Sequence, residues 1–554
     1  MNAVDMTAIG SLGGLWEARV RATPTRRAYQ DFREGAWRTY AWADMAFEVG
    51  RVRAALIHEG LRPGDRVGIC ARNSARWVIC DMAVLSLGLV LVPLFFNDRP
   101  ENLVFCLEDS GTKLLFVDQA PAPLVRALPL RRIVGLTEEA HDTTNWSSWC
   151  AAHTAPPAAV ARDDLATIVY TSGTTGRPKG VMLTHGNILA NCAGLMDAVR
   201  EVVAGDHRFL SFLPLSHMFE RTTAHFIGIA IGAETVFARG IAELPDDLRT
   251  ARPTLLVSVP KIFERTYARM QAVLAQKPLM ARLLRFLVAQ QLAVFRGEAR
   301  RWQRLAARLL DGVLGKRLRA PFGGRLQYVF LGGAPAQPAL LAFFVGIGLR
   351  FLQGYGLTEA APVLTCNRVG DRQLASVGRP LPHVELRFAD GELCARGPNI
   401  MRGYWANAQA TAAVIDAEGF LHTGDLGRME AGEVYLTGRL KDIIVLSNGE
   451  KIAPADAEQA ILMDPAFEQV LVVGEGRGSL GLLAVTRLAD VHDIMERANR
   501  QLHAFPGYAR IHHAAVLTEP WTIENDLLTP TLKPRRQAIE ARYRDVIDAL
   551  YGGP

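Results

Sequence analysis

The chain has 554 residues, of which 49% are hydrophobic and 21% are charged, a composition typical of globular proteins rather than disordered or fibrous ones. This length exceeds what one hydrophobic core usually holds, so two or more domains are expected. The formal net charge of +6 is small, and no basic stripe is interleaved with aromatic residues, which argues against nucleic-acid binding.

The cysteines and the apolar runs indicate a cytoplasmic protein. The seven cysteines have neither the spacing nor the histidine cluster of a zinc site, so they are expected to be reduced thiols. The N-terminal segment lacks a basic region and contains Asp5, so no secretory signal is expected. The longest apolar run, 82–96, is shorter than the roughly 20 residues of a bilayer span, and no membrane-spanning helix is predicted.

From about residue 40 to residue 440, short apolar runs alternate with longer amphipathic segments. This alternation favours stacked α/β units with largely parallel sheets. The runs that we interpret as strands are 65–71, 89–95, 113–118, 167–172, 254–260, 327–335 and 349–356. Ligands of open α/β sheets bind beyond the carboxyl ends of the strands, so the segments 170–180, 331–335 and 353–359 are expected to converge there.

The pattern of apolar runs and glycines changes after residue 390. Between Gly391 and Gly438, frequent glycines separate short strands, which indicates a small β-rich subdomain. After Arg439 the pattern begins again with a helix and a strand in 451–476, a strand in 480–488 and a helix near 489–504. This part has about 110 residues, enough for a separate α+β domain. We therefore predict an N-terminal domain of 1–438 and a C-terminal domain of 439–554.

The segment YTSGTTGRPKG, 170–180, is suited to surround an anion, and a polyphosphate is the expected ligand. Its glycines let backbone N–H groups turn toward one point, and Lys179 adds charge. The run 164–170 is predicted to be a buried strand and 181–199 a helix. The segment is not a Walker A loop, because Pro178 precedes the lysine and Gly180 follows it. A tight surface turn is the alternative.

Seven further motifs follow in order: FLPLSHMFER (212–221), LGGAP (331–335), QGYGLTE (353–359), GELCARGPNIMRGYW (391–405), HTGDLG (422–427), GRLKDIIVLSNGEKIAP (438–454) and NDLLTPTLKPRR (525–536). With these motifs the chain resembles the adenylate-forming superfamily of acyl- and aryl-CoA synthetases, and it looks most like the long-chain fatty-acid CoA ligases. The resemblance covers about residues 15 to 540. It implies a large N-terminal domain, a small mobile C-terminal domain with its hinge at 439–442, and the use of ATP, Mg²⁺ and CoA.

The glycine-rich segment and Glu359 are the predicted phosphate and metal site. Lys179 and the loop suit the β- and γ-phosphates, and the loop residues concerned are Thr171, Ser172, Gly173, Thr174, Thr175 and Gly176. Glu359 is a lone acid beside an apolar strand end and a natural Mg²⁺ ligand, because that metal prefers oxygen donors. The resemblance adds Thr171 as a second metal ligand. Alternatively, Glu359 is a helix-capping partner of Thr358.

Asp425 is the predicted ribose ligand, since a carboxylate after a turn can accept two hydrogen bonds from a diol. An Asx-turn is the alternative. The resemblance favours the nucleotide role and implies Arg439 on the same ribose and phosphate. It also implies that Tyr355 stacks on adenine and that Thr358 reaches the α-phosphate. By the same resemblance, the residues that border the base are Gly333, Gln353 and Gly354.

Lys533 is the predicted adenylation lysine. It lies between Pro530 and Pro534 in a short extended loop that could deliver a cation to the reacting oxygens. A basic segment near a C-terminus is ordinarily solvated, but the resemblance implies catalysis. The resemblance also implies that the domain turns about Lys441 between two half-reactions. His217 lies among apolar residues, and without the resemblance this setting would indicate a core histidine. The resemblance implies instead that His217 lies beside the substrate carboxylate and does not act as a base.

The segment 279–319 combines leucine, phenylalanine and valine with arginine at helical spacing. Such a basic amphipathic surface could contact anionic lipid on the inner face of the membrane. The competing interpretation is that the apolar stripe packs on the core, as in most amphipathic helices.

These motifs lead to three hypotheses about function. The first is a ligase that activates a medium- or long-chain fatty acid with ATP and joins it to CoA. The second keeps adenylation but passes the acyl group to the phosphopantetheine of an acyl carrier protein, as in fatty acyl-AMP ligases. The third is a catalytically silent lipid- or nucleotide-binding protein, and the presence of Lys179, Glu359, Asp425 and Lys533 argues against it.

Overall fold

The computed structural model describes residues 3–171, 177–529 and 531–552. An eight-stranded sheet forms the first half of the large domain. Its strands β4, β3, β5, β6 and β7 are parallel to one another, and antiparallel pairing occurs at the edge, between β8 and β9 and between β9 and β19. Its strands, in spatial order, are β19 (Gly403–Tyr404), β9 (Lys179–Thr184), β8 (Leu165–Thr171), β4 (Val90–Leu94), β3 (Arg66–Cys70), β5 (Leu114–Val117), β6 (Arg132–Gly135) and β7 (Thr144–Asn145).

A nine-stranded sheet forms the second half, and its central strands from β14 to β1 are parallel. In spatial order its strands are β16 (Arg379–Pro380), β15 (Val363–Cys366), β14 (Phe351–Gly356), β13 (Tyr328–Leu331), β12 (Leu255–Ser258), β10 (Arg208–Ser211), β11 (Glu234–Phe237), β1 (Arg27–Arg33) and β2 (Ala36–Ala41). The predicted β-rich subdomain is an antiparallel sheet of β17 (Glu385–Ala389), β18 (Glu392–Arg396), β20 (Leu421–Glu430) and β21 (Glu433–Arg439).

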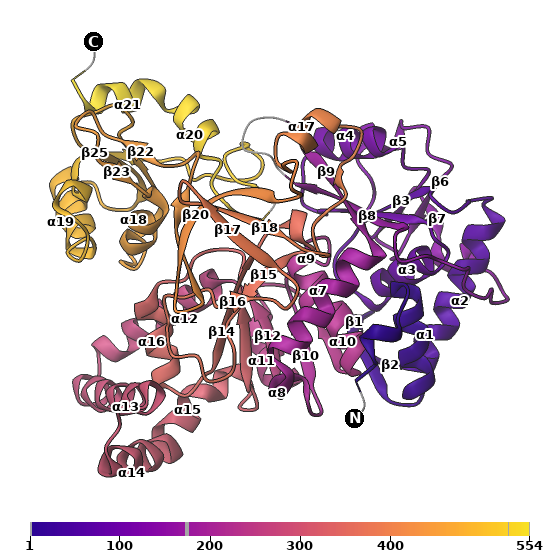
Figure 1. Cartoon of the computed structure of the whole chain (residues 1–554), viewed down its shortest axis with the longest axis horizontal. Coiled ribbons are helices and arrows are strands. Elements are labelled where there is room, and N and C mark those ends of the chain that lie inside the picture. The colour runs from indigo at the N-terminus through magenta and orange to yellow at the C-terminus, as the bar shows by residue number, and fades with distance from the viewer. Residues whose placement is uncertain (1–2, 172–176, 530, 553–554) are drawn as a thin grey trace.

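Helices cover these sheets, and the C-terminal part forms a separate lobe at the upper left of Figure 1. The α-helices before that lobe are α1 (Leu12–Ala22), α2 (Trp42–His58), α3 (Ala75–Ser86), α4 (Pro100–Ser110), α5 (Pro123–Arg126), α6 (Trp146–Trp149), α7 (His185–Ala198), α8 (Arg200–Val203), α9 (Met218–Glu220), α10 (Ile227–Ile231), α11 (Leu244–Ala251), α12 (Pro260–Ala275), α13 (Pro278–Arg296), α14 (Arg301–Leu310), α15 (Lys316–Arg319), α16 (Pro338–Gly346) and α17 (Ala408–Ala412). Two π-helical turns, η2 (Arg221–Phe226) and η3 (Asp311–Gly315), and the 3₁₀ turns η1 (Met6–Ala8), η4 (Ala320–Phe322) and η5 (Thr358–Ala360) complete this part.

The C-terminal lobe has its own core, made by a three-stranded sheet and the helices packed on it. The three-stranded sheet consists of β24 (Phe467–Val473), β25 (Leu480–Thr486) and β26 (Ile511–Leu517). A separate pair of short strands is formed by β22 (Ile444–Val445) and β23 (Lys451–Ile452). The helical elements of the lobe are α18 (Pro454–Ile461), α19 (Val491–Gln501), η6 (Gly507–Ala509), α20 (Arg536–Arg542) and α21 (Arg544–Leu550). The predicted α+β character of this part is confirmed. The domain border at 438 and 439 remains a prediction, although β21 ends at Arg439.

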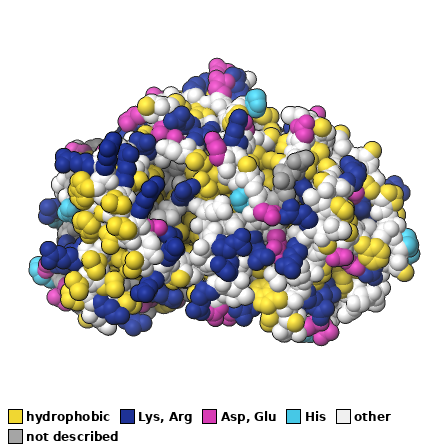
Figure 2. Space-filling model, turned by 90° about the horizontal axis from the view of Figure 1, so that it is seen from below, with side chains coloured by type: hydrophobic (Ala, Val, Ile, Leu, Met, Phe, Trp, Pro, Cys, Tyr) yellow, Lys and Arg dark blue, Asp and Glu magenta, His cyan; other side chains and the backbone are white. Residues whose placement is uncertain are grey.

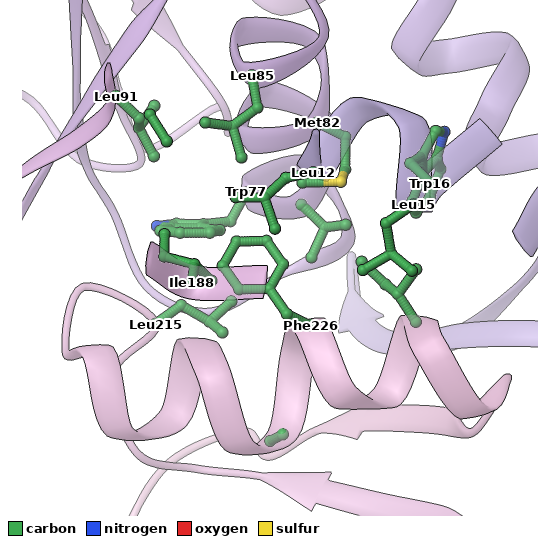
Figure 3. Packing of buried hydrophobic residues seen from close by; sticks show 14 of the residues in the cluster. Leu12, Leu15, Trp16, Trp77, Met82, Leu85, Leu91, Ile188, Leu215 and Phe226 are labelled. Carbon is green, nitrogen blue, oxygen red and sulfur yellow. The ribbon is translucent and has the colours of Figure 1, made fainter. Parts of the chain in front are cut away.

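The main core lies between the two large sheets and is built by side chains from α1, α3, α7, η2 and α10. In Figure 3, Trp77 of α3 and Phe226 of η2 face one another within this cluster. The guanidinium of Arg221 lies 5.6 Å and 5.5 Å from the centroids of these two rings. Arg221 pairs there with Asp81, and neither side chain is exposed to solvent. The two sheets are therefore joined through a core that contains a buried ion pair.

One local prediction is wrong. The segment after the glycine-rich loop begins with strand β9, antiparallel to β8, and the predicted helix starts only at His185. Thr184 accepts a hydrogen bond from the N–H of Asn187 and fixes that start. The loop therefore joins two strands of a hairpin and has no helix N-terminus behind it. The seven predicted strands are confirmed, and all seven cysteines are free.

The buried pair gives a prediction about stability. Replacing Arg221 with alanine should lower the free energy of unfolding by about 3–5 kcal/mol, because Asp81 would be left charged in the core. Arg249→Ala breaks an exposed pair with Asp246 and should cost less than about 1 kcal/mol. Urea denaturation of both variants measures the difference. Equal losses would show that the pair does not support the core.

Candidate active site

The phosphate side of the candidate site is the β8–β9 hairpin. Thr171, the last residue of β8, lies opposite Lys179, the first residue of β9. Strand β19 adds to the free edge of β9, with the N–H of Trp405 donating to the carbonyl of Gly180 at 2.7 Å. A Cβ at Gly180 would lie 2.7 Å from Ile168, so only glycine fits where the strands meet. The predicted phosphate contacts Ser172, Gly173, Thr174, Thr175 and Gly176 lie outside the described residues.

Tyr404 connects Lys179 to Glu359. The Nζ atom of Lys179 lies 5.1 Å from the centroid of the Tyr404 ring, and the Tyr404 hydroxyl donates to Oε1 of Glu359 at 2.8 Å. Burial, then the charge of Glu359 and this hydrogen bond, raise the pKa of Tyr404, so its hydroxyl stays a donor. The structure thus brings together a cation for phosphate and a carboxylate for a metal.

Glu359 does not cap a helix in this structure. The short helix η5 has Leu357 at its N-cap without a side-chain cap, and the Glu359 carboxylate is held instead by Tyr404. The backbone carbonyl of Glu359 accepts from the N–H of Met401 at 2.8 Å, which fixes the turn. A half-buried carboxylate beside the phosphate hairpin fits Mg²⁺, which binds through one or two carboxylates together with substrate phosphates. The assignment of Thr171 and Glu359 as metal ligands remains a prediction.

The ribose side centres on Asp425, which is buried within β20 and is not part of a turn. Its Oδ2 accepts a hydrogen bond from the Tyr355 hydroxyl at 2.7 Å, and its Oδ1 accepts from Nε of Arg439 at 2.6 Å. Arg439 is the direct partner of Asp425 across β20 and β21. A carboxylate has about four acceptor positions, so two remain for a ribose diol. Tyr355 and Arg439 hold these positions in place.

The residues predicted to border the base lie at the ends of β13 and β14. Gly333 follows β13 with φ +79°, a conformation that favours glycine. Gln353 is buried, and its amide donates to the carbonyls of Leu374 and Ser376, so this side chain fixes the following loop. Gly354 lies between Gln353 and Tyr355 in β14. The ring of Tyr355 is buried in a small apolar cluster. Stacking of Tyr355 on adenine and the base contacts remain predictions, as does contact of half-buried Thr358 with the α-phosphate.

The charge of Lys533, in the C-terminal lobe, is coupled to Asp425 of β20, to Arg439 at the end of β21 and to His217. The surroundings of Lys533 lower its pKa: desolvation contributes most, then the charge of Arg439, while Asp425 opposes the shift. The side chain is nevertheless reached by water, so protein atoms surround it without sealing it. Desolvation and then the charge of Lys533 lower the pKa of His217 to about 4. The charge of the predicted catalytic lysine therefore acts on the predicted substrate-side histidine, and the predicted ribose ligands act on the lysine.

His217 also has a local structural role. It precedes α9, and its Nδ1 accepts a hydrogen bond from the N–H of Phe219 at 3.1 Å. With its pKa lowered to about 4, the ring is neutral at physiological pH. The place of His217 beside the substrate carboxylate remains a prediction.

The loop of Lys533 tolerates Pro534 because its backbone hydrogen bonds come from other residues. The N–H of Thr529 donates to the carbonyl of Lys533 at 2.9 Å, and the N–H of Arg535 donates to the carbonyl of Leu527 at 2.9 Å. The missing N–H of the proline is therefore not needed.

Direct contacts join the two domains. Arg99 pairs with Asp526 at 3.0 Å, next to the Lys533 loop. On the other side, the Gln459 amide donates to the carbonyl of Pro335 at 2.8 Å. Exposed Lys441, the predicted hinge residue, lies in the turn between β21 and β22, and the N–H of Leu440 before it donates to the carbonyl of Gly424. The hinge role of Lys441 remains a prediction.

Sequence reasoning missed Tyr404 and Arg99. Tyr404 is in the motif GELCARGPNIMRGYW, so its position was visible, but its link between Lys179 and Glu359 depends on the pairing of β19 with β9. Arg99 lies in a segment without a motif, and its partner is 427 residues away in the chain.

The arrangement of Lys179, Glu359, Asp425 and Lys533 is compatible with the resemblance to adenylate-forming enzymes. Comparison with known families agrees: residues 16–405 match the model for AMP-binding enzymes, and residues 441–553 match the model for the AMP-binding enzyme C-terminal domain. The chain belongs to the AMP-binding enzyme family, and the resemblance drawn from its motifs is confirmed.

Curated relatives cover nearly the whole chain. The long-chain-fatty-acid–CoA ligase FadD15 of Mycobacterium tuberculosis is 31% identical, over 96% of this chain and 95% of the relative. Long-chain-fatty-acid–CoA ligase 1 of Homo sapiens is 29% identical, over 90% and 80% of the two chains. The predicted enzyme class, an acid–thiol ligase, is confirmed.

Solved structures confirm the fold class. The anthranilate CoA ligase AuaEII in complex with anthranoyl-AMP aligns with a TM-score of 0.77 at 19% identity, over 97% of this chain and 99% of that one. The didomain of carboxylic acid reductase from Segniliparus rugosus, in complex with AMP, aligns with a TM-score of 0.79 at 21% identity, over 99% and 84%.

The ribose site predicts a loss of nucleotide affinity in Asp425→Asn. Hydrogen bonds to charged groups contribute about 1.5–3 kcal/mol, so the Kd for ATP should rise roughly tenfold to a hundredfold. Tyr355→Phe keeps the carboxylate and its pair with Arg439 and should weaken binding less than about tenfold. Isothermal titration calorimetry gives both values. Unchanged affinity in Asp425→Asn would remove this residue from the nucleotide site.

The lowered pKa of Lys533 predicts the pH dependence of adenylation. As pH rises, this lysine loses its proton before an ordinary lysine with a pKa of 10.5, so acyl-AMP formation should fall on the alkaline side below that pH. In Lys533→Arg the guanidinium stays protonated, and the alkaline fall should move to higher pH. His217→Gln, which removes no cation near neutral pH, should keep the fall where it is. An identical profile in Lys533→Arg would assign the fall to another group.

Proposed function

We propose that this protein activates medium- or long-chain fatty acids with ATP and transfers the acyl group to CoA. The observation that carries the proposal is the electrostatic coupling of Lys533, from the C-terminal lobe, to Asp425 and Arg439 and to His217. If Asp425 and Arg439 bind the ribose and His217 flanks the substrate, as we propose, Lys533 can act where the acid and the nucleotide meet. The names of the curated relatives support the fatty acid as substrate.

The first half-reaction is attack of the fatty-acid carboxylate on the α-phosphate of ATP. A bond forms between a carboxylate oxygen and the α-phosphorus, the bond to the bridging oxygen breaks, and pyrophosphate leaves with the bonding electrons. Negative charge on these oxygens is stabilised by the cations of Lys533 and Lys179. The carboxylate is already ionised, so no general base is needed.

Glu359 is the residue that we propose to hold Mg²⁺, with Thr171 at the end of β8 as second ligand. When bound, the metal neutralises phosphate charge. Tyr404 positions the Glu359 carboxylate by donating to Oε1. Lys179, whose Nζ atom lies 5.1 Å from the centroid of the Tyr404 ring, is the proposed cation for the phosphate oxygens.

The second half-reaction joins the acyl group to a thiol. The thiolate sulfur attacks the acyl carbon, and the bond to the AMP oxygen breaks. We propose that the C-terminal domain turns at Lys441 and withdraws Lys533, so that the thiol can approach. CoA is the proposed acceptor because the relatives are named as CoA ligases. A carrier-protein phosphopantetheine is the alternative: one structural neighbour is solved together with its PCP domain.

A thioester screen tests the proposed function. The purified protein is supplied with ATP, magnesium, CoA and saturated acids of graded length, and the acyl-CoA is measured by chromatography. We expect products from medium- and long-chain acids with release of AMP. If acyl-AMP accumulates in the presence of CoA and is consumed only when a carrier protein is added, the carrier protein is the acceptor. If no acid yields acyl-AMP, the protein is a catalytically silent binding protein.

Lys533→Ala should abolish acyl-AMP formation and largely spare thioester formation from preformed acyl-AMP, because the cation is needed only while charge develops on the phosphate oxygens. Lys451→Ala, an exposed lysine of the same lobe, should leave both half-reactions unchanged. Quenched-flow measurement of each half-reaction separates the steps. Loss of transfer alone in Lys533→Ala would contradict the proposed role.

We propose a cytoplasmic location with peripheral contact at the inner face of the membrane through 279–319. The charge and exposed apolar side chains of this segment support the proposal.

A further inference from the structure

The helices α13 and α14 carry apolar side chains on two different sides. On α13, Leu284 and Leu287 are buried against the core that also contains Phe344 of α16. Other apolar side chains between residues 279 and 319 are exposed to solvent, and these are Leu279, Met280, Leu283, Phe286, Val294, Trp302, Leu305, Leu309 and Val313. The interpretation that the apolar stripe packs on the core is therefore correct for only part of the apolar side chains of 279–319.

On α14 the exposed residues form two parallel stripes. Trp302, Leu305 and Leu309 recur at the i, i+3, i+7 spacing of one helix face and are 55%, 60% and 65% exposed. Arg301, Arg304 and Arg308 have the same spacing one position earlier, so a row of guanidinium groups runs beside the row of apolar side chains. Within the described part of the chain, these arginines make no salt bridge. Ala307 is buried on the opposite side, which holds α14 to the domain.

This surface concentrates the charge of the protein. Residues 279–319 contain ten basic residues and two acidic ones, Glu298 and Asp311, whereas the rest of the chain contains 52 basic and 54 acidic residues. The segment thus carries a net charge of +8 and the remainder −2. Figure 2 shows hydrophobic side chains gathered, with Lys and Arg beside them, at the left of the face, on the side where α13 and α14 lie in Figure 1.

A membrane-spanning role for α13 does not fit its packing. Among the described residues, Pro278–Arg296 is the one helix long and apolar enough to cross a membrane by length and composition, which is weak evidence. Leu284 and Leu287, buried in the core with Phe263 and Phe344, tie α13 to the domain. Arg282 and Arg285 would moreover lie in the hydrocarbon, where charged side chains are costly. The helix therefore lies on the protein surface.

We infer that α13 and α14 dock the protein on an anionic lipid bilayer, with Trp302, Leu305 and Leu309 entering the headgroup boundary and the arginine row contacting lipid phosphates. Interfacial helices combine an apolar face with a lysine- and arginine-rich flank, and each basic residue near an anionic surface adds to the attraction. The +8 segment on an otherwise slightly negative protein supplies this complementarity and sets which face meets the bilayer. Docking needs neither ATP nor CoA, so it stands apart from the proposed catalysis.

Vesicle sedimentation of the full-length protein tests the docking. We expect binding to vesicles of phosphatidylcholine with phosphatidylglycerol, much weaker binding to phosphatidylcholine alone, and loss of binding as salt rises, because the attraction is screened. Leu305→Ser/Leu309→Ser and Arg304→Gln/Arg308→Gln should each lower the fraction bound at least tenfold. Phe47→Ser/Ile57→Ser changes two exposed apolar residues of α2 and should bind as the wild type does.

Trp302 gives a second readout. Brominated lipids quench tryptophans that enter the bilayer, so the wild type should be quenched on docking, and Trp302→Phe should bind but lose most of this quenching. Equal binding by the wild type and both α14 variants, or no binding to anionic vesicles at low salt, would overturn the inference. Self-association that is lost in Leu305→Ser/Leu309→Ser without vesicle binding would assign the surface to a second copy. Adenylation of a soluble acid without vesicles should be unchanged in these variants.

Discussion

The carboxylate of Asp425 is the group on which the geometry of the active site depends. It is buried, and a buried charge is stable only when it is paired and hydrogen-bonded. Tyr355 from the nine-stranded sheet and Arg439 at the end of β21 supply these bonds. One carboxylate therefore fixes the β-rich subdomain against the large sheet and orients Arg439, the last residue of β21. The same charge partly offsets the desolvation of Lys533.

The predicted phosphate and ribose ligands lie within the large domain and at the end of β21, whereas the predicted catalytic lysine comes from the C-terminal lobe. Lys179, Tyr404 and Glu359 are held by three paired strands and a short helical turn of the large domain. Lys533 comes from a lobe with its own core, joined to the large domain by contacts such as Arg99–Asp526 and Gln459–Pro335. Interfaces of this polar kind permit relative domain motion. An enzyme with two half-reactions requires such a division, because the same space must admit first a lysine and then a thiol.

Much of the fold was predictable because buried parallel strands leave apolar runs that end in glycine. The strands at 327–335 and 349–356 follow this rule. The segment after the glycine-rich loop was mistaken for a helix because β9 and α7 are both apolar and join at Thr184 without a break. Motifs indicated Glu359, Asp425 and Lys533, and also Tyr355 and Arg439, which hydrogen-bond to Asp425, but not Tyr404 beside Glu359. Tyr404 reaches Glu359 only through a strand pairing, and periodicity could not tell which apolar side chains of α13 and α14 remain in water.

The central claim is that both domains together activate an acid on ATP before any thiol takes part. The most direct measurement is the exchange of labelled pyrophosphate into ATP, with magnesium and a fatty acid present and CoA absent. We expect exchange that requires the acid and is lost when the acid is omitted, since acyl-AMP formation is reversible at the assembled site. Absence of exchange across a broad panel of acids, with a folded protein that still binds ATP, would contradict the claim.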